Sequence, residues 1–343
     1  MVSGGGADLR IAGSALIDRR PFVIFNPASG RGRGARRLGL YRELLDRHLP
    51  GHAVGITEHP GHEATLADRA MDAGHDLIIA VGGDGTWSHV ADRVGERGSE
   101  VALAVLPAGT GNDFGRNLGL SFGDPEAAVR AIASGRERRV DLGRVVTPSY
   151  PTPPGARTAE GSRRAPAHRI GPEEPARPRH FLNVIGIGFD VAVIDAAASA
   201  RLLTGALLYK LTALRQLFGF PGIRARIATA GEAQLNARHL MMTVTNGCYF
   251  GGGFPIAPEG RIDDGRLHGC FIEDAPPWTR LTLFARAERG RHVGDARVTL
   301  RSSRGFRFEF DAPVRFEADG DTYATEGHHL ELEVKPGALL LRG

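Results

Sequence analysis

Three short loops of glycine and small polar residues follow three apolar runs in the N-terminal third of the chain. The loops span residues 26–30, 82–86 and 107–113, and each comes directly after a run of the kind that forms a buried strand. The carboxyl ends of parallel strands meet at one edge of a sheet, where glycines let backbone N–H groups approach phosphate oxygens. The loops therefore predict one nucleotide site, and they constrain the fold more than any other feature.

The N-terminal region alternates short apolar runs with amphipathic segments. Strands are predicted at residues 22–25, 53–57, 77–81 and 101–106, and helices at 36–48, 62–73, 87–97 and 125–134. This alternation is typical of a parallel sheet covered by helices. We therefore predict an α/β domain over residues 21–140, which holds the predicted nucleotide site and is preceded by a disordered tail at residues 1–20.

The predicted nucleotide site has to neutralise phosphate charge without a lysine. The chain has lysine only at Lys210 and Lys335, and neither lies in a glycine-rich loop. Mg²⁺, backbone amides and helix N-termini can take this role, and Asp84 and Asp113 are the carboxylates placed to hold the metal. Each single loop also fits simple turn formation, because glycine commonly follows strands. Three such loops, two of them with an aspartate, favour the phosphate site.

The chain beyond residue 140 has a different sequence pattern. β-type runs recur at residues 181–185, 240–245, 267–272, 306–310 and 330–334, between turn-rich loops. They predict a β-rich second domain over residues 141–343, whose C-terminal end is free to pack back on the first domain. Residues 147–179 are crowded with Pro, Arg, Gly and Ala and nearly free of large apolar side chains, which predicts a mobile insertion.

Charge and composition limit the partners and the compartment. The formal net charge of +4 is spread along the chain, and we find no nucleic-acid-binding signature. Cys248 and Cys270 lie in apolar runs, which favours reduced thiols in the cytoplasm. No window reaches the roughly 18 uninterrupted apolar residues of a spanning helix, so we expect membrane contact to be peripheral. An apolar stripe over residues 201–218 favours core packing, with membrane docking as the alternative.

Two acidic turns in the second half are candidates for the acceptor side of a phosphoryl transfer. They are Asp263-Asp264-Gly265 and Asp319-Gly320-Asp321. A phosphoryl acceptor needs a nearby base to take its proton, and a carboxylate in a constrained loop suits that role. Asp-Gly is also the commonest hairpin-turn signal, so by the residues alone the turn interpretation comes first for both segments.

The segments 26–30, 82–86 and 109–116 resemble the three hallmark motifs of the diacylglycerol kinase catalytic-domain family, in its bacterial soluble branch, which is related to sphingosine and ceramide kinases. The resemblance continues through residues 183–190, 246–258, 263–267 and 319–321. It implies a phosphofructokinase-like three-layer α/β nucleotide-binding domain followed by a β-sandwich domain, with the active site in the cleft between them. It implies ATP contacts at Asn26, Ser29, Thr57, Gly83, Asp84, Gly85, Thr86 and Thr110, to which the loops add Pro27, Gly30, Gly82, Gly109 and Asn112.

The same resemblance assigns roles to the acidic residues. Asp264 matches a residue that helps to bind a second, structural Mg²⁺ in the family. Asp321 matches the acid that accepts the proton of the lipid hydroxyl. Asp84 and Asp113 complete the predicted catalytic carboxylates, with Asp84 also on the metal.

The chain departs from the family pattern at two places. Ser88 and His89 stand where the family has Asn-Glu, and the final Asp-Gly-Glu motif is Asp-Gly-Asp here, ending at Asp321. A lone helical histidine is usually an ordinary, partly buried residue, so His89 is left out of the predicted site.

These features predict an ATP- and Mg²⁺-dependent lipid kinase that transfers the γ-phosphoryl group to a lipid hydroxyl, with diacylglycerol as the favoured acceptor and phosphatidic acid as the product. A NAD kinase or a sugar-phosphate kinase with a soluble acceptor is the rival enzyme, because these share the Gly-Asp-Gly loop. A catalytically inactive nucleotide-binding regulatory protein is the third hypothesis. The predicted partner is a lipid at a membrane surface, the predicted localisation is cytoplasmic with peripheral membrane association, and homodimer formation stays open.

Overall fold

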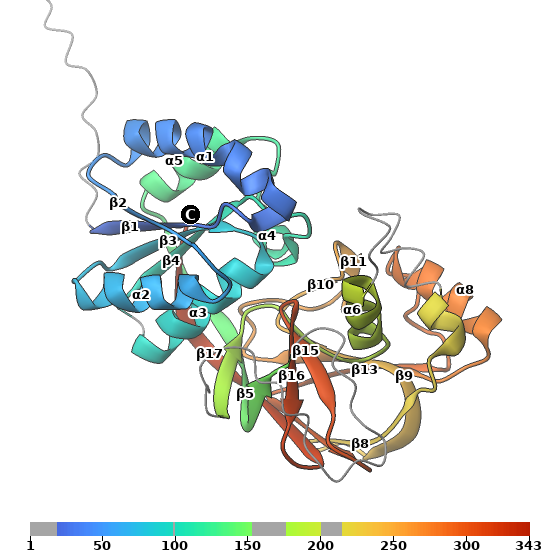
Figure 1. Ribbon diagram of the computed structural model, residues 1–343. Coiled ribbons are helices and arrows are strands. Elements are labelled where there is room, and N and C mark those ends of the chain that lie inside the picture. The colour runs from blue at the N-terminus through green and yellow to red at the C-terminus, as the bar shows by residue number, and fades with distance from the viewer. Residues whose placement is uncertain (1–18, 99, 153–175, 200–214) are drawn as a thin grey trace, which may run out of the picture.

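A parallel sheet with helices on both faces forms the N-terminal domain (Figure 1). The computed structural model describes residues 19–98, 100–152, 176–199 and 215–343. The strand order is β2-β1-β3-β4, with β1 (Pro21–Phe25), β2 (Ala53–Ile56), β3 (Leu77–Gly82) and β4 (Ala102–Pro107). The helices are α1 (Ser29–His48), α2 (His62–Asp72), α3 (Asp84–Arg97), α4 (Asp113–Asn117) and α5 (Pro125–Ala133).

The helices divide between the two faces of this sheet because its central strands are apolar on both sides. Every residue of β3 and β4 is buried. One face packs on α1 and α5 through Tyr41 and Val129, and the other packs on α2 and α3 through Ala67 and Trp87. Strands buried on both faces are typical of parallel sheets in α/β proteins. The predicted α/β class of this domain is confirmed.

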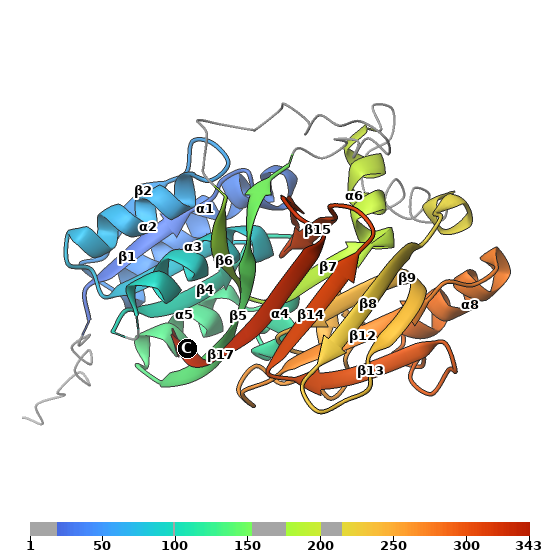
Figure 2. The same cartoon turned by 90° about the horizontal axis from the view of Figure 1, so that it is seen from below.

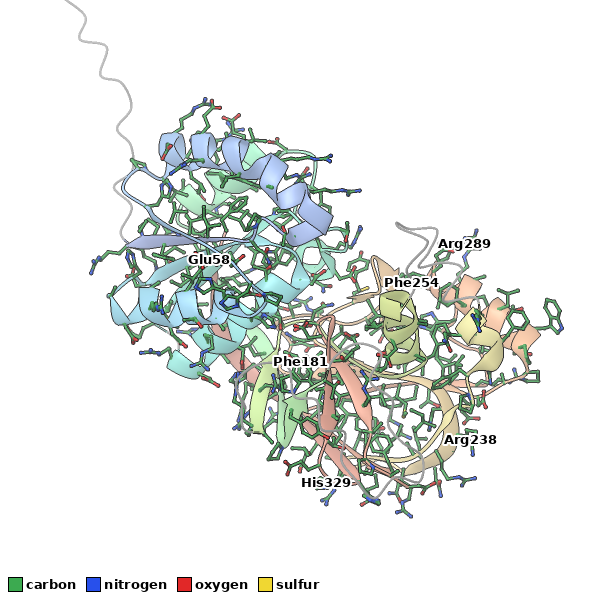
Figure 3. All side chains as sticks on the ribbon, in the orientation of Figure 1. Glu58, Phe181, Arg238, Phe254, Arg289 and His329 are labelled. Carbon is green, nitrogen blue, oxygen red and sulfur yellow. The ribbon has the colours of Figure 1, made fainter. Side chains whose placement is uncertain are left out.

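The C-terminal domain is rich in β-structure. Its strands are β5 (Glu137–Pro151), β6 (Arg177–Phe181), β7 (Val184–Gly188), β8 (Ile223–Thr229), β9 (Leu235–Thr245), β10 (Tyr249–Phe250), β11 (Phe254–Pro255), β12 (Leu267–Glu273), β13 (Val298–Ser303), β14 (Gly305–Phe310), β15 (Arg315–Ala318), β16 (Asp321–Thr325) and β17 (His329–Arg342). Two helices, α6 (Phe189–Ser199) and α8 (Pro277–Ala287), lie against it. Phe181, labelled in Figure 3, lies in its apolar core with Phe271, Phe306 and Phe316. The predicted β-rich domain is also confirmed.

The long strand β17 joins the two domains. Its last residues, Leu340 and Leu341, pair in parallel with β4, and residues on either side of its bulge pair antiparallel with β5. Figure 2 shows β5 and β17 side by side, running from the N-terminal domain into the C-terminal one. β17 also pairs with β14, so among the described residues one continuous sheet runs through both domains. Backbone hydrogen bonds between paired strands therefore connect the two domains and fix their relative orientation.

The structure changes the predicted limits of the first domain. Arg19 and Arg20, assigned to the disordered tail, are anchored: Arg19 Nε lies 2.6 Å from Glu137 Oε1, and the Arg20 N–H donates to Asp76 Oδ1 at 2.6 Å. Residues 1–18 lie outside the described residues. The predicted boundary at 140/141 falls inside β5, because this strand continues from one domain into the other.

Parts of the predicted insertion 147–179 form strands. Residues 147–151 belong to β5 and residues 177–179 to β6, and Ser149 pairs with Arg177 across the two strands. The prediction was wrong there because small polar side chains such as Thr147 and Ser149 are buried between apolar neighbours. Residues 153–175 lie outside the described residues, as does most of the stripe at 201–218.

Three further predictions of element limits were wrong, and all three elements lie at the site. The helices α1 and α3 begin at Ser29 and Asp84, several residues before their predicted starts, so the glycine loops run directly into helix N-termini. The predicted strand 181–185 is broken after Phe181, because the N–H groups of Leu182 and Asn183 donate to a side chain, Asp319, instead of a neighbouring strand.

Candidate active site

A cavity of about 710 Å³ lies between the two domains, at the carboxyl edge of the N-terminal sheet. The three loops identified in the sequence all line it, as predicted. From the C-terminal domain it is lined by Asn183, Val184, Asp190, Ile194, Phe250, Gly251, Gly252, Glu317, Asp319, Gly320 and Asp321. The cavity therefore brings together segments that are more than 200 residues apart in the chain.

The loop side of the cavity depends on close backbone approach. A Cβ added to Gly109 would lie 2.5 Å from the Cα of Gly83, so neither loop tolerates a side chain at their contact. The side chains of Asn26 and Thr86 tie the first loop to the second through a 2.9 Å hydrogen bond from Nδ2 to Oγ1. Backbone amides at helix N-termini attract anions, so this side of the cavity suits phosphate oxygens.

Most of the predicted nucleotide-binding residues line the cavity, and two do not. Gly82 and Asn112 are absent from its wall. The carbonyl of Gly82 instead accepts the N–H groups of Ala108 and Gly109, at 2.7 and 3.0 Å. Asn112, in the left-handed region at φ 54°, caps α4 and donates from Nδ2 to the Gly109 carbonyl at 3.3 Å. Both residues therefore shape the loops from behind the cavity wall.

Asp84 and Asp113 both line the cavity. Asp84 Oδ1 accepts the N–H of Phe114 at 3.1 Å, and Asp113 Oδ2 accepts the N–H of Gly252, from the other domain, at 2.8 Å. Burial raises the pKa of Asp84, against the lowering effect of backbone N–H bonds. Burial, together with the charge of Asp84, raises the pKa of Asp113 to about 6. Two such carboxylates side by side favour binding of a cation.

The hairpin turn between β15 and β16 supplies the opposite wall. Asp319 and Gly320 have φ angles of 50° and 98°, so the segment is a tight turn and a cavity wall at once. The carboxylate of Asp319 is buried and accepts the backbone N–H groups of Leu182, Asn183 and Val184, at 2.6, 2.9 and 2.8 Å. It also accepts the Ser88 hydroxyl of α3 at 2.5 Å, which fixes the turn against the N-terminal domain.

Asp321 lies in this wall as predicted, and its partner is the residue that the sequence prediction left out. His89 Nε2 lies 2.7 Å from Asp321 Oδ2, and His89 Nδ1 lies 2.6 Å from Glu63 Oε1 of α2. All three side chains line the cavity. His89 was left out of the predicted site, yet it lines the cavity, because its partners come from distant segments. The signal that could have indicated it was the departure from the family's Asn-Glu at residues 88–89.

Two further acids of the cavity were also missed as site residues. Asp190, at the start of α6, and Glu317 of β15 are both buried and line the cavity. Neither oxygen of Asp190 has a hydrogen-bond partner within the described parts of the chain. Burial raises the pKa of Asp190 to about 7, and burial with the charge of Asp190 raises that of Glu317 well above its usual range. Asp190 does belong to the segment 183–190 that carries the family resemblance.

Asp264, the predicted ligand of a structural Mg²⁺, does not line this cavity. Its Oδ1 accepts the N–H of Arg266 at 3.0 Å, and its Oδ2 lies 3.0 Å from His268 Nε2. Among the described residues no cluster of three or more His, Cys, Asp or Glu side chains is arranged to hold a metal ion. The second metal site therefore stays a prediction, and His268 competes for the same carboxylate.

A smaller apolar cavity adjoins the large one. It has a volume of about 60 Å³ and shares Asp190, Phe250 and Gly251 with the large cavity. Its other lining residues come mainly from α6, α8 and the strands between them: Phe189, Val193, Leu217, Leu240, Met241, Phe254, Ile256, Ile272, Arg280, Leu283, Phe284 and Ala287. Phe254, labelled in Figure 3, packs on Phe284 of α8. The described helices include none long and apolar enough to cross a membrane.

The fold and the cavity define a kinase-like protein. Its mixed α/β domain and its β-rich domain meet at the large cavity, which the three glycine loops line. Residues 20–145 match the family described as the diacylglycerol kinase catalytic domain. Residues 183–342 match the family described as the YegS C-terminal NAD kinase beta sandwich-like domain. The first part of the chain is thus similar to one family and the second part to the other.

Curated relatives agree with this assignment. A probable lipid kinase, YegS-like, from Pseudomonas aeruginosa is 28% identical over 288 residues, which cover 84% of this chain and 83% of the relative. A diacylglycerol kinase from Mycobacterium tuberculosis is 26% identical over 301 residues, or 87% of each chain. The crystal structure of a diacylglycerol kinase from Bacillus anthracis superimposes with a TM-score of 0.64 at 19% identity, over 94% of this chain and 96% of that one, and supports the fold.

Proposed function

We propose that this protein is an ATP-dependent lipid kinase that transfers the γ-phosphoryl group to a lipid hydroxyl, with diacylglycerol as the acceptor and phosphatidic acid as the product. The observation that carries the proposal is the apolar cavity beside the polar one, joined to it at Asp190, Phe250 and Gly251. A soluble nucleotide or sugar acceptor has no use for such a cavity, whereas an acyl chain gains free energy by entering it. The names of the relatives support the same acceptor class.

Mg²⁺-ATP fits the loop side of the large cavity. Asp113 Oδ1 is buried and has no hydrogen-bond partner among the described residues, with the nearest cation, Arg116 Nε, at 3.6 Å, and Asp84 Oδ2 lies beside the loop at Gly111. Carboxylate oxygens are ligands that Mg²⁺ prefers, and the bound ion neutralises charge on the transferred phosphoryl group. The backbone amides of the three loops, with the N-termini of α1 and α3, bind the phosphate oxygens. The hydrogen bond between Asn26 and Thr86 holds the first two loops together.

On the other side of the cavity, Asp321 is the base. The lipid hydroxyl loses its proton to the Asp321 carboxylate while its oxygen bonds to the γ-phosphorus, and the bond from that phosphorus to ADP breaks. The carboxylate is ionised, since burial raises its pKa but the hydrogen bond and charge of His89 lower it further, for a net lowering. The aspartates 84 and 113 face the metal and the phosphates.

Exposed aromatic side chains next to the apolar cavity suit peripheral contact with a membrane. Trp278 of α8 is 74% exposed and packs edge-on against Phe218, with ring centroids 5.6 Å apart. Phe284, three residues before the end of the same helix, lines the apolar cavity. Tryptophan favours the membrane interface, so a lipid would pass from the bilayer to the cavity along this helix. Cytoplasmic localisation, a phosphofructokinase-like first domain, a β-sandwich second domain and homodimer formation belong to the same proposal.

The test is incubation of the purified protein with γ-labelled ATP, Mg²⁺ and a panel of lipids in mixed micelles, beside NAD and sugar phosphates. Label extracted into organic solvent as phosphatidic acid supports the proposal. Label that stays in the aqueous phase supports the soluble-acceptor kinase, and no turnover with any acceptor supports the regulatory protein.

A variant sharpens this test. Leu283→Trp fills the apolar cavity and should raise the KM for diacylglycerol about tenfold, with an unchanged KM for ATP. Leu300→Trp, on the exposed side of β13, is the matched control, because Leu300 is 37% exposed and lies outside both cavity walls. Equal lipid KM values in the two variants would count against the acyl-chain assignment.

A further inference from the structure

Three side chains from three separate elements form a hydrogen-bonded row along the cavity wall. Glu63 comes from the first turn of α2, His89 from the middle of α3 and Asp321 from the first position of β16. The distances are 2.6 Å from Glu63 Oε1 to His89 Nδ1 and 2.7 Å from His89 Nε2 to Asp321 Oδ2. The ring therefore uses both nitrogens to join a carboxylate of one domain to a carboxylate of the other.

The two flanking carboxylates keep the His89 imidazole protonated and positively charged. Burial lowers the pKa of His89, but the hydrogen bonds and charges of Asp321 and Glu63 raise it more, to about 10. An imidazolium donates from both nitrogens, which is what two flanking carboxylates require. The other charged groups that interact with Asp321 are Glu317 of β15 and Arg179 of β6.

The row crosses from one domain to the other at the cavity wall. His89 lies five residues after Asp84 in α3, and Asp321 ends the Asp-Gly-Asp turn. The two side chains contact each other directly. An imidazolium and a carboxylate carry opposite charges and attract each other at this distance.

We propose that His89, held by Glu63, is a positioning residue for the acceptor base: it binds Asp321 through Oδ2 and leaves Oδ1 free for the lipid hydroxyl. This inference rests on the proposed function. Among the described residues, His89 is the one side chain that hydrogen-bonds to Asp321, whose own side chain is 48% exposed. The ring limits the positions that the Asp321 carboxylate adopts.

In this proposal Asp321 accepts the proton, and His89 only positions it. The hydroxyl proton passes to Asp321 Oδ1, the hydroxyl oxygen forms its bond to the γ-phosphorus, and ADP leaves with the electrons of the broken phosphorus–oxygen bond. His89 keeps both of its protons throughout. The imidazolium lowers the pKa of Asp321 and thereby keeps the base ionised at mildly acid pH.

The first experiment is the pH dependence of kcat for His89→Gln with saturating Mg²⁺-ATP and lipid, between pH 5.5 and 8.5. Glutamine keeps a hydrogen-bond donor but removes the charge, so the pKa of Asp321 rises and less of the base is ionised at low pH. We expect kcat to fall about 10- to 100-fold at pH 6 and clearly less at pH 8, whereas the wild-type profile stays flat. The affinity for ATP should not change.

His48→Gln is the matched control. His48 of α1 also pairs with a carboxylate, Glu126 Oε1 at 3.3 Å, but it lies outside the cavity wall. It should reproduce the wild-type profile. If the wild type is active and His89→Gln shows the same pH dependence of kcat, the inference is overturned. A wild type without lipid kinase activity would overturn the proposed function, and the two failures are therefore distinguishable.

Two further measurements do not depend on His89→Gln folding. Glu63→Gln weakens the contact between residue 63 and the His89 ring. Like His89→Gln, it should lower kcat, by about threefold, with the larger loss again at low pH. The imidazole carbon shifts of His89, followed by NMR, should titrate near pH 10 in the wild type and lower in Asp321→Asn. A His89 that titrates near its usual 6.5 in the wild type would show that the row is not charged as inferred.

Discussion

The two walls of the large cavity are built in different ways. The loop wall consists of three continuous segments, each following a parallel strand, and its polar groups are mainly backbone amides held by contacts such as that of Gly83 with Gly109. The acidic wall collects single side chains from α2, α3, α6, β15 and β16. The first wall is a property of local sequence, and the second exists only when the two domains meet.

The difference has an electrostatic consequence. The loop wall offers N–H groups and helix N-termini to an anion, whereas Asp190, Glu317, Asp319 and Asp321 gather negative charge on the other side. Burial raises the pKa of Asp319 to about 6, although four hydrogen bonds oppose the shift. A base can stay ionised in such a cluster only with a cation beside it, and His89 supplies that cation.

The largest effect is expected on the loop wall, from Asp84→Asn. Asparagine still accepts the N–H of Phe114 but removes the charge that we propose binds Mg²⁺, so phosphoryl transfer should fall by about 10³-fold or more. Rates are measured with γ-labelled ATP in single turnovers. Asp72→Asn, at an exposed ion pair with Arg97, is the control and should act like wild type. Near-normal turnover in Asp84→Asn would remove the metal from this side of the cavity.

On the acidic wall, Asp321→Asn should lower kcat by about 10²- to 10⁴-fold with ATP affinity close to wild type. Asp321→Glu should also lower the rate, because the longer side chain moves the carboxylate by about an ångström against His89. The measurements are steady-state kinetics with lipid and calorimetric binding of ATP. If Asp321→Asn keeps most of its turnover, the base has to be sought elsewhere, with Asp113 as the next candidate.

The close approach of the loops gives a third, smaller effect. In Gly109→Ala the new Cβ meets the Gly83 backbone, so the loops must separate, and we expect ATP affinity to fall about tenfold and stability by about 1–3 kcal/mol. Gly123→Ala, where a Cβ meets open space, is the control. Thermal melting and ATP titration check both variants. A Gly109→Ala protein that binds ATP normally would mean that the backbone contact does not shape the phosphate site.

The smallest effect is expected outside both walls. Ser149 pairs with Arg177, so the chain ends on either side of residues 153–175 are held close together by β5 and β6. Replacing residues 153–175 with a short Gly-Ser linker should change the melting temperature by no more than about 2 °C and kcat by less than about twofold. A deletion of 147–179 instead removes strand residues and should destabilise the protein. A large loss with the short linker would show that residues 153–175 contribute to the fold or the site.

The sequence by itself determined the α/β domain, its three glycine loops and the β-rich second half, because strand periodicity and glycine placement are local properties of the chain. The family resemblance indicated Asp321, whereas the residues alone favoured a turn, and the segment 319–321 is a turn that lines the cavity. The tertiary structure decided the partners of each acid. Asp319 accepts N–H groups 135 to 137 residues away, and His89 meets Glu63 and Asp321 from two other elements. Such contacts leave no periodic trace, because one buried side chain depends on packing between domains and not on its neighbours in the chain.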